Sequence, residues 1–225
     1  MLRQLESHLW VLDKPFRIPG AELGVRMTVV RLKNGDLWVH SPVRTTPEER
    51  GAIDGLGRVA HIVAPSKVHH LFAAELKSCY PEAKLYVAPG LSQKNRALVA
   101  SDPLTERAPT GWGGEIEVAP FAGAPSLNES VFLYGRTLIV TDLVFNYVSA
   151  ETFGTKLFLT LDGALGGLRA SRILRLCIKD RAAARASIER ILSWDFDRII
   201  VCHGEVLPSG GRDELRRAFR FLLGT

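Results

Sequence analysis

The chain has 225 residues, of which 46% are hydrophobic and 24% charged, and its formal net charge is +5 at pH 7. These values are typical of a folded globular protein that can bury a sizeable core. A membrane-spanning protein is excluded, because no apolar run reaches the roughly 18–20 residues that a helix needs to cross a bilayer. Acids at Glu6 and Asp13 interrupt the stretch where a secretory signal would be apolar, so a cytoplasmic location without a membrane partner is expected.

The cysteines and the charge distribution narrow the class further. Cys79, Cys177 and Cys202 form neither a CxxC pair nor a disulfide framework, which fits a reducing compartment. Seven Lys or Arg residues lie between Arg169 and Arg190, against two acids. This cluster is compatible with solvated helix faces or with a surface for phosphate groups, and no aromatic interleaving favours nucleic acid. The positive charge favours an anionic small molecule as the partner, and the oligomeric state stays open.

The first half of the chain predicts strands followed by strand–helix units. Residues 9–41 are rich in β-branched and apolar residues, and Asn34-Gly35 is a strong hairpin signal. Thr46-Pro47 followed by two glutamates is typical of the start of a helix. Further elements are expected in the order strand, helix, strand, helix, at residues 61–65, 68–80, 84–89 and 91–99.

The second half begins after a Pro-, Gly- and Thr-rich loop at residues 102–114. Strands are predicted at residues 115–121, 130–135, 137–143 and 197–203. Helices are predicted over residues 151–177 with a break at 163–167, then from the cap Asp180 to Leu192, and finally at residues 213–223. Strand-rich segments in each half with helices around them predict two packed sheets covered by helices on both sides. We expect a single domain over residues 1–225.

Histidines and one acid recur where predicted strands end. His40 ends one strand, His69 and His70 follow the next, and Asp142 and His203 end two strands of the second half. Because the ends of buried strands converge at one edge of a sheet, these side chains are candidates for a shared site. Asn128 and Glu129 are weaker candidates for the same edge.

Several segments resemble the metallo-β-lactamase fold superfamily, in a divergent and uncharacterised branch with a domain of unknown function. The resemblance covers roughly residues 8–210 and rests on the order of elements and on the segments NGDLWVHSPV, HIVAPSKVHHLFAAEL, VFLYGRTLIVTDLVFN and IIVCHGEVL. It implies an α/β fold of the α+β kind: a four-layer αββα sandwich of two mixed β-sheets flanked by helices. The metal ligands of that superfamily lie on loops at one edge of the sheets.

The resemblance also implies that the first of the two metal sites of the superfamily is lost. The two histidines of the usual His-x-His pair correspond to Pro65 and Lys67, and the third ligand of that metal falls near Pro125. Proline has no side-chain ligand, and the Lys67 ammonium would repel a cation. His40 stands where an aspartate is usual.

The second site is largely retained. Its ligand positions correspond to His69, His70, Asp142 and His203, with His69 in place of a carboxylate. Imidazoles and a carboxylate suit one Zn²⁺, with Fe²⁺ or Mn²⁺ as alternatives. An ion with one open position lowers the pKa of a bound water towards neutrality, so Asp142 and His203 are also the catalytic candidates.

The expected function is a mononuclear metal-dependent hydrolase of a small ester, thioester, amide or phosphoester. His40, Lys67 and Tyr147 are expected to line its pocket. One alternative is a metal-free, non-catalytic relative that binds a small molecule in the same cleft, with Lys67 paired to Asp142. A nucleic-acid-processing enzyme, suggested by charge alone, is the third.

Overall fold

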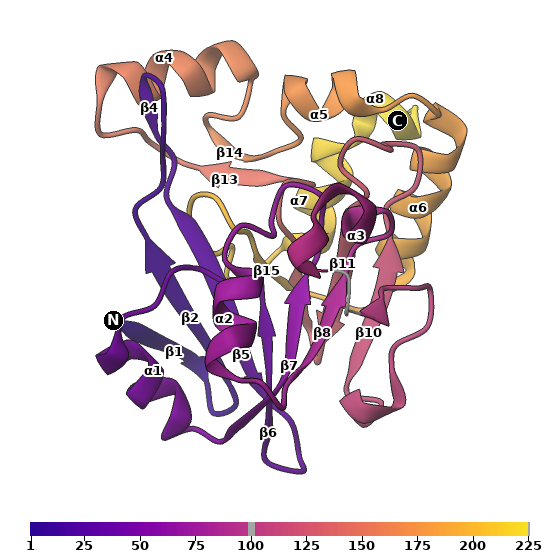
Figure 1. Ribbon diagram of the computed structural model, residues 1–225. Helices are drawn as coiled ribbons and strands as arrows, with labels where there is room; N and C mark the ends of the chain where they lie inside the picture. The colour runs from indigo at the N-terminus through magenta and orange to yellow at the C-terminus, as the bar shows by residue number, and fades with distance from the viewer. Residues whose placement is uncertain (99–101, 225) are drawn as a thin grey trace.

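Two β-sheets face each other and are covered by helices on their outer sides, as the computed structural model shows (Figure 1). Residues 1–98 and 102–224 are described. Within them, the larger sheet has the order β1-β2-β5-β6-β7-β8-β9, with β1 (Leu2–Glu6), β2 (Leu9–Lys14), β5 (Val25–Arg31), β6 (Asp36–His40), β7 (Arg58–Ala64), β8 (Lys84–Val87) and β9 (Asp102–Pro103). The smaller sheet has the order β10-β11-β12-β15, with β10 (Ile116–Pro120), β11 (Ser130–Tyr134), β12 (Thr137–Ile139) and β15 (Arg198–Ile200).

Both sheets are mixed. The strands from β1 to β6 pair antiparallel, whereas β6, β7, β8 and β9 run parallel. In the smaller sheet, only the pairing of β12 with β15 is parallel. Two short ribbons lie at the edge of the sandwich, formed by β3 (Arg17–Ile18) with β4 (Ala21–Glu22) and by β13 (Phe145–Tyr147) with β14 (Gly167–Arg169).

The helices form the outer layers (Figure 1). Those on the larger sheet are α1 (Pro47–Asp54), α2 (Ala73–Cys79) and α3 (Leu91–Lys94), and their buried side chains share one cluster with alternate residues of β6 and β7. Those against the smaller sheet are α5 (Arg172–Cys177), α6 (Arg181–Ser193), α7 (Gly211–Ala218) and α8 (Arg220–Leu223). Helix α4 (Phe153–Asp162) lies above the sandwich, beside β4.

The layer between the sheets is aromatic. Trp38 of β6, Phe132 of β11 and Trp112 are fully buried, and the rings of Trp38 and Phe132 meet edge to face with centroids 5.1 Å apart. Successive residues of a strand point to opposite faces, so Trp38 and His40 point into the sandwich while Leu37 and Val39 pack under the helices. The αββα sandwich that the sequence predicts is confirmed.

Most predicted elements are present with shifted ends. The hairpin at Asn34-Gly35 joins β5 to β6, with Gly35 at a φ of +85°. Thr46 caps α1 through a capping box with Glu49, and Asp180 caps α6. The predicted helix at residues 91–99 is shorter, since α3 ends at Lys94 and a 3₁₀ turn follows; Val99 lies outside the described residues.

Two ribbon segments were not predicted as strands. The sequence predicts no strand at β13, and β14 lies in a region predicted to be mainly helical. Both strands are short, and their pairing depends on contacts far along the chain, which local patterns do not show. In the described part of the chain, no helix is long and apolar enough to cross a membrane.

Candidate functional site

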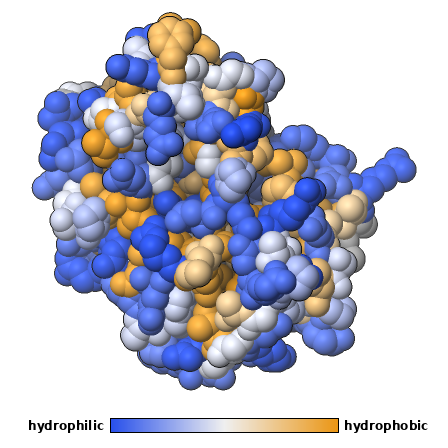
Figure 2. Space-filling view, turned by 90° about the vertical axis from the view of Figure 1, so that its left-hand side faces the viewer, coloured by the Kyte–Doolittle hydropathy of each residue, from blue (hydrophilic) through white to orange (hydrophobic). Residues whose placement is uncertain are grey.

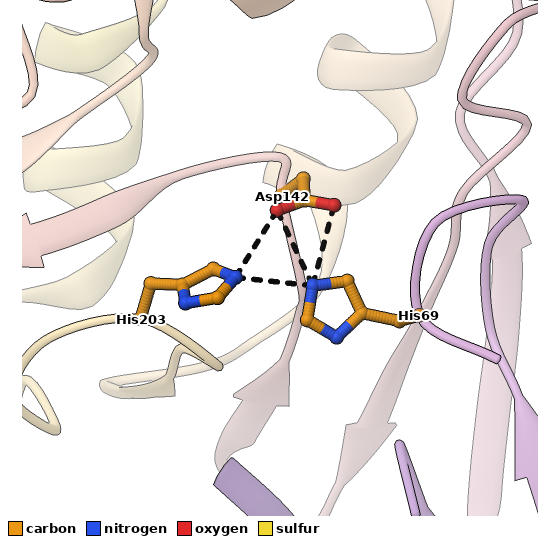
Figure 3. A group of neighbouring side chains, drawn as sticks. All are labelled: His69, Asp142 and His203. Carbon is orange, nitrogen blue, oxygen red and sulfur yellow. Dashed lines mark hydrogen bonds and ion pairs between the residues drawn. The ribbon is translucent and has the colours of Figure 1, made fainter. Parts of the chain in front are cut away.

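The side chains of His69, Asp142 and His203 point towards one another at the upper edge of the sandwich (Figure 3). Asp142 follows β12, and His203 follows the neighbouring parallel strand β15, so both chain segments leave the sheet at the same edge. His69 comes from the other sheet, on the loop after β7. Three segments far apart in sequence therefore supply one group.

The loop that carries His69 was wrongly predicted to be helical. Helix α2 begins only at Ala73. The Ser66 hydroxyl accepts hydrogen bonds from the backbone N–H groups of Val68 at 3.2 Å and His69 at 2.9 Å. Serine hydroxyls that bond nearby backbone groups compete with helix formation, and the resulting turn directs the His69 ring inwards.

Three donor atoms of this group lie within contact distance. Nε2 of His69 is 3.1 Å from Nε2 of His203 and 3.3 Å from both carboxylate oxygens of Asp142. Nε2 of His203 is 3.4 Å from Oδ1 of Asp142. Atoms bound to one tetrahedral zinc ion at about 2.0–2.1 Å are about 3.3–3.4 Å apart. The spacing thus fits a single small cation.

Backbone and hydroxyl groups orient the two imidazoles. The backbone carbonyl of Gly24 lies 2.8 Å from Nδ1 of His203, so this nitrogen must donate, and the neutral ring then has its lone pair on Nε2. Nδ1 of His69 lies 3.0 Å from the Ser41 hydroxyl, which can accept its proton. Outer contacts of this kind fix the tautomer of a metal-binding histidine. Where the Ser41 hydroxyl accepts from Nδ1 of His69, two lone pairs face each other across 3.1 Å, and a shared cation would satisfy both; where that hydroxyl donates instead, Nε2 of His69 carries the proton and donates to His203.

Asp142 supplies the negative charge of the group. Burial alone would raise the pKa of its carboxyl, but the imidazoles of His69 and His203 hold that pKa well below its usual range. In the described part of the chain, its Oδ2 atom is buried and has no hydrogen-bond partner. A buried carboxylate oxygen without a donor is costly. Its polar neighbour is Nε2 of His69 at 3.3 Å, and a bound cation would satisfy this oxygen as well.

Glu129 fixes the backbone of the segment that carries Asp142. Its carboxylate is fully buried and accepts hydrogen bonds from the backbone N–H groups of Thr141 at 2.6 Å and Asp142 at 2.9 Å. Burial raises the pKa of Glu129 to about 8, and the Asp142 carboxylate adds to the increase. Glu129 therefore positions the backbone of Asp142 rather than facing the cleft.

Uncommon backbone conformations at Ser41 and Gly204 allow close contacts beside His69 and His203. Ser41 has a positive φ of +52°, a conformation that non-glycine residues rarely adopt outside constrained sites, and it holds the hydroxyl against His69. Gly204 has a φ of +89°, and a Cβ atom there would overlap with the backbone carbonyl of Asn146. That carbonyl accepts the N–H of Glu205, so β13 packs directly on the His203 loop.

His70, the fourth predicted metal ligand, and His40, a predicted pocket residue, lie beside this group. His70 is not part of the group formed by His69, Asp142 and His203. It lines a small cavity of about 80 Å³ together with the two other histidines, and burial lowers its pKa. His40 is fully buried against Trp38, and burial together with His69 lowers its pKa to about 3. His40 lines no cleft in the described residues.

Lys67 and Tyr147 also point elsewhere. The Lys67 ammonium donates a hydrogen bond to the backbone carbonyl of Pro125 at 2.9 Å, and within the described residues it forms no ion pair with Asp142. Two of the three residues that the resemblance places at ligand positions of the first metal site, Lys67 and Pro125, thus bond to each other. The Tyr147 hydroxyl donates to the Leu23 carbonyl, and its ring lines a separate polar cavity near α4.

A cleft of about 350 Å³ opens beside Asp142 and His203. Its walls come from the β3–β4 ribbon, β13, α4 and α5, and they are mainly apolar, with Phe16, Phe145 and Phe158 among them. Asp142 and Asp162 are its acidic residues, and no lysine or arginine lines it. Asp162 is buried and accepts the N–H of Ile173, in the first turn of α5, at 2.9 Å. The cleft suits an uncharged apolar group next to the polar centre.

Sequence reasoning missed several residues that shape this site. Ser41 and Gly24 act through a hydroxyl and a backbone carbonyl, which carry no sequence signature. Glu129, in the loop before β11, was predicted only as a weak candidate for the sheet edge that carries the site. The available signal was an acid directly before the largely apolar strand β11.

Comparisons with known proteins give a family and a fold. Residues 6–153 match the family described as Domain of unknown function (DUF4336). No curated protein matches the chain.

Solved structures of metallo-β-lactamases have a similar fold. The DIM-1 enzyme, in a structure exposed to ceftazidime, is 11% identical with a TM-score of 0.67, over 98% of this chain and 96% of that one. The protein from Hirschia baltica is 8% identical with a TM-score of 0.65, over 99% and 97%. The protein from Pontibacter korlensis is 12% identical with a TM-score of 0.63, over 96% and 98%. At these identities the likeness shows the fold alone.

The burial of Glu129 predicts a pH effect on stability in the metal-free protein. An acid whose pKa is raised in the folded chain stabilises it most below the unfolded pKa, here 4.5, and that contribution is lost as the pH rises through about 8. Glu129→Gln should therefore flatten the pH dependence of the unfolding free energy over this range, measured by denaturant titration in chelator. Glu117→Gln, an exposed acid on β10, is the matched control and should behave as wild type. An unchanged slope in Glu129→Gln would contradict the assignment.

The close approach at Gly204 predicts a larger cost than its positive φ alone. Gly35 has nearly the same φ, +85°, but open space around its Cβ position. Gly35→Ala should cost about 1–2 kcal/mol from backbone strain. Gly204→Ala should cost more, because the new methyl group must displace β13 or the His203 loop. Thermal unfolding of both variants tests this, and equal losses would mean that the packing of β13 on this loop is loose.

Proposed function

The chain belongs to the family described as Domain of unknown function (DUF4336) and has the metallo-β-lactamase fold, and on this premise we propose that it is a hydrolase dependent on one divalent metal ion. His69, Asp142 and His203 are the proposed ligands. The observation that carries the proposal is the convergence of two imidazole Nε2 atoms and a carboxylate within 3.1–3.4 Å at a partly buried position.

The donor set favours zinc. Two imidazole nitrogens and one carboxylate, with a fourth position left open, is the composition of many catalytic zinc sites. Iron and manganese accept the same ligands, so zinc is proposed on ligand type and spacing. Such an ion supplies a Lewis acid and lowers the pKa of a water molecule that it binds.

The residues of the chain orient the three proposed ligands and exclude water from one side of them. His203 keeps its Nε2 lone pair towards the centre because Nδ1 donates to the Gly24 carbonyl. The Ser41 hydroxyl is hydrogen-bonded to Nδ1 of His69, so Nε2 of that ring stays directed at the centre. Glu129 fixes the backbone of Asp142, so its carboxylate stays directed at the two rings. The apolar cleft walls exclude water from one side, which strengthens charge interactions at the centre.

The proposed substrate is a small molecule with an ester, thioester, amide or phosphoester bond next to an apolar group. The net charge of the chain favoured an anionic partner, but the cleft lining has no cation and contains Asp142 and Asp162. An uncharged apolar substituent in the cleft fits this lining better. The three free cysteines of the described chain support a reducing, cytoplasmic compartment.

No contact of Lys67 within the described residues supports the alternative of a metal-free protein that binds a small molecule in the same cleft. It required Lys67 to pair with Asp142, whereas the Lys67 ammonium donates to the Pro125 carbonyl. The nucleic-acid alternative gains no observation at the cleft, whose lining has no lysine or arginine.

Metal content tests the proposal. Protein purified without a histidine tag should hold about one equivalent of zinc, because the three ligands define one site. Asp142→Ala should lose metal affinity by more than the 10–100-fold that is typical for removing an outer partner. Lys67→Ala, which removes a cation outside the group, is the control and should keep its metal. Affinity should fall as the pH is lowered, since the imidazoles must bind deprotonated.

Three results would contradict the proposal. They are wild-type protein that binds no divalent ion at micromolar concentration, a stoichiometry of two ions per chain, or an Asp142→Ala variant that binds zinc as tightly as wild type. Elemental analysis and equilibrium dialysis distinguish these cases.

A further inference from the structure

Helix α4 has a row of exposed apolar side chains on its outer face. Phe153, Leu157 and Leu161 follow one another at a spacing of four residues, so they lie on the same side of the helix. All three are exposed, Phe153 at 81%. The opposite side of α4 is buried through Thr155 and Leu159. Single exposed hydrophobic residues are common, but a continuous row usually marks a contact surface.

Helix α5 extends this row. Ile173 and Leu176 are exposed, the latter at 73%, while Leu174 between them is buried. The two helices are joined, because the Arg172 guanidinium donates to the Leu161 carbonyl at 3.1 Å. We call the exposed side chains of α4 and α5 together the α4–α5 face: Phe153, Leu157, Leu161, Ile173 and Leu176. Both helices lie at the top of the molecule in Figure 1, and Figure 2 shows hydrophobic atoms protruding at the same end.

Unpaired cations surround the α4–α5 face. The exposed cations of this region are Lys156, Arg169, Arg172, Arg175 and Lys179. Within the described residues, none of them forms an ion pair with an acid. Arg185 and Arg190 of the neighbouring helix α6, in contrast, pair with Glu189 and Glu106. The cations nearest the apolar row therefore have no acidic partner among the described residues, although the Arg175 guanidinium lies over the Phe221 ring at 4.3 Å.

The α4–α5 face borders the cleft. Ile173 belongs to the face and also lines the cleft, and Phe158 and Leu174 line the cleft from the inner sides of the same two helices. A molecule held at the face would lie next to the mouth of the cleft, which leads to Asp142 and His203.

We propose that the α4–α5 face binds the surface of an anionic phospholipid bilayer. Apolar side chains among exposed cations are the arrangement by which a protein lies on a membrane, with the apolar groups below the head groups and the cations against them. No spanning helix is needed for this mode, so the absence of one among the described residues does not oppose it. As an extension that rests on the proposed function, the cleft would receive the apolar chain of an amphiphilic substrate from that surface.

Charge decides between a bilayer and a second copy of the chain. A two-fold dimer places the same patch against itself, and the five cations around this one would then meet with fewer exposed acids, Glu151 and Asp180, on the same segments. Nucleic acid would satisfy the cations, but it offers nothing to the exposed Phe153 and Leu176. An anionic bilayer complements both parts of the face.

Co-sedimentation with lipid vesicles tests the proposal. Wild-type protein should bind vesicles of phosphatidylcholine with about 30% phosphatidylserine, and binding should weaken with salt and with purely neutral vesicles. Phe153→Ser with Leu176→Ser should weaken binding at least about tenfold, because both side chains are exposed and would leave the acyl region. Lys156→Gln with Lys179→Gln should also weaken it about tenfold. Lys33→Gln with Lys84→Gln, which removes two exposed cations far from α4 and α5, is the matched control and should bind as wild type.

The other outcomes overturn the proposal. If the wild type does not bind anionic vesicles but forms a dimer that the Phe153→Ser and Leu176→Ser changes dissociate, the face is a self-association surface. If neither vesicle binding nor a dimer is found, the face has no such role. Circular dichroism confirms that each variant is folded. The measurement needs neither metal nor turnover, so its failure leaves the proposed hydrolase untouched, and a metal-free protein could still bind vesicles.

Discussion

The central constraint in this protein is the close approach of two imidazoles and a carboxylate that the fold forces together. Two imidazole nitrogens lie 3.1 Å apart, with a carboxylate 3.3–3.4 Å from them. Because Nδ1 of His203 is committed to a backbone carbonyl, its Nε2 cannot relieve the contact by donating in the neutral ring. A metal ion between these atoms would satisfy both nitrogens and the carboxylate at once, whereas a proton on Nε2 of His69 would satisfy one contact at a time. The spacing and the unpaired Oδ2 of Asp142 favour the metal ion.

The surrounding structure serves to hold these three side chains. Glu129 is buried at a cost, since its raised pKa reflects an unfavourable environment for its charge, yet it secures the backbone that carries Asp142. Ser41 is held in an uncommon backbone conformation against His69. Such strained or poorly solvated groups persist where the rest of the fold determines them, and they gather at functional sites. The sandwich supplies this support because strands β7, β12 and β15 end at one edge.

The sequence predicts the layers well, and the details of the site only in part. Alternating patterns and the Asn34-Gly35 turn depend on local chemistry, so the sheets and the outer helices could be inferred. His69 was expected on a helix because residues 68–80 have a helical pattern. The hydroxyl of Ser66 instead accepts backbone hydrogen bonds there and turns the chain. Lys67 was expected in the cleft, but the Pro125 carbonyl, 58 residues away, provides its partner. Contacts of that kind depend on the packed fold and have no local signature.

The nature of the ligands around a bound metal ion tests the account most directly. X-ray absorption at the zinc edge, on protein loaded with one equivalent of zinc, reports the type and number of atoms bound to the ion. The account predicts only nitrogen and oxygen neighbours at about 2.0–2.2 Å, with the outer-shell pattern of two imidazoles. A sulfur neighbour would place Cys202 at the ion, and a pattern of three imidazoles would add His70. Either result would contradict a centre formed by His69, Asp142 and His203.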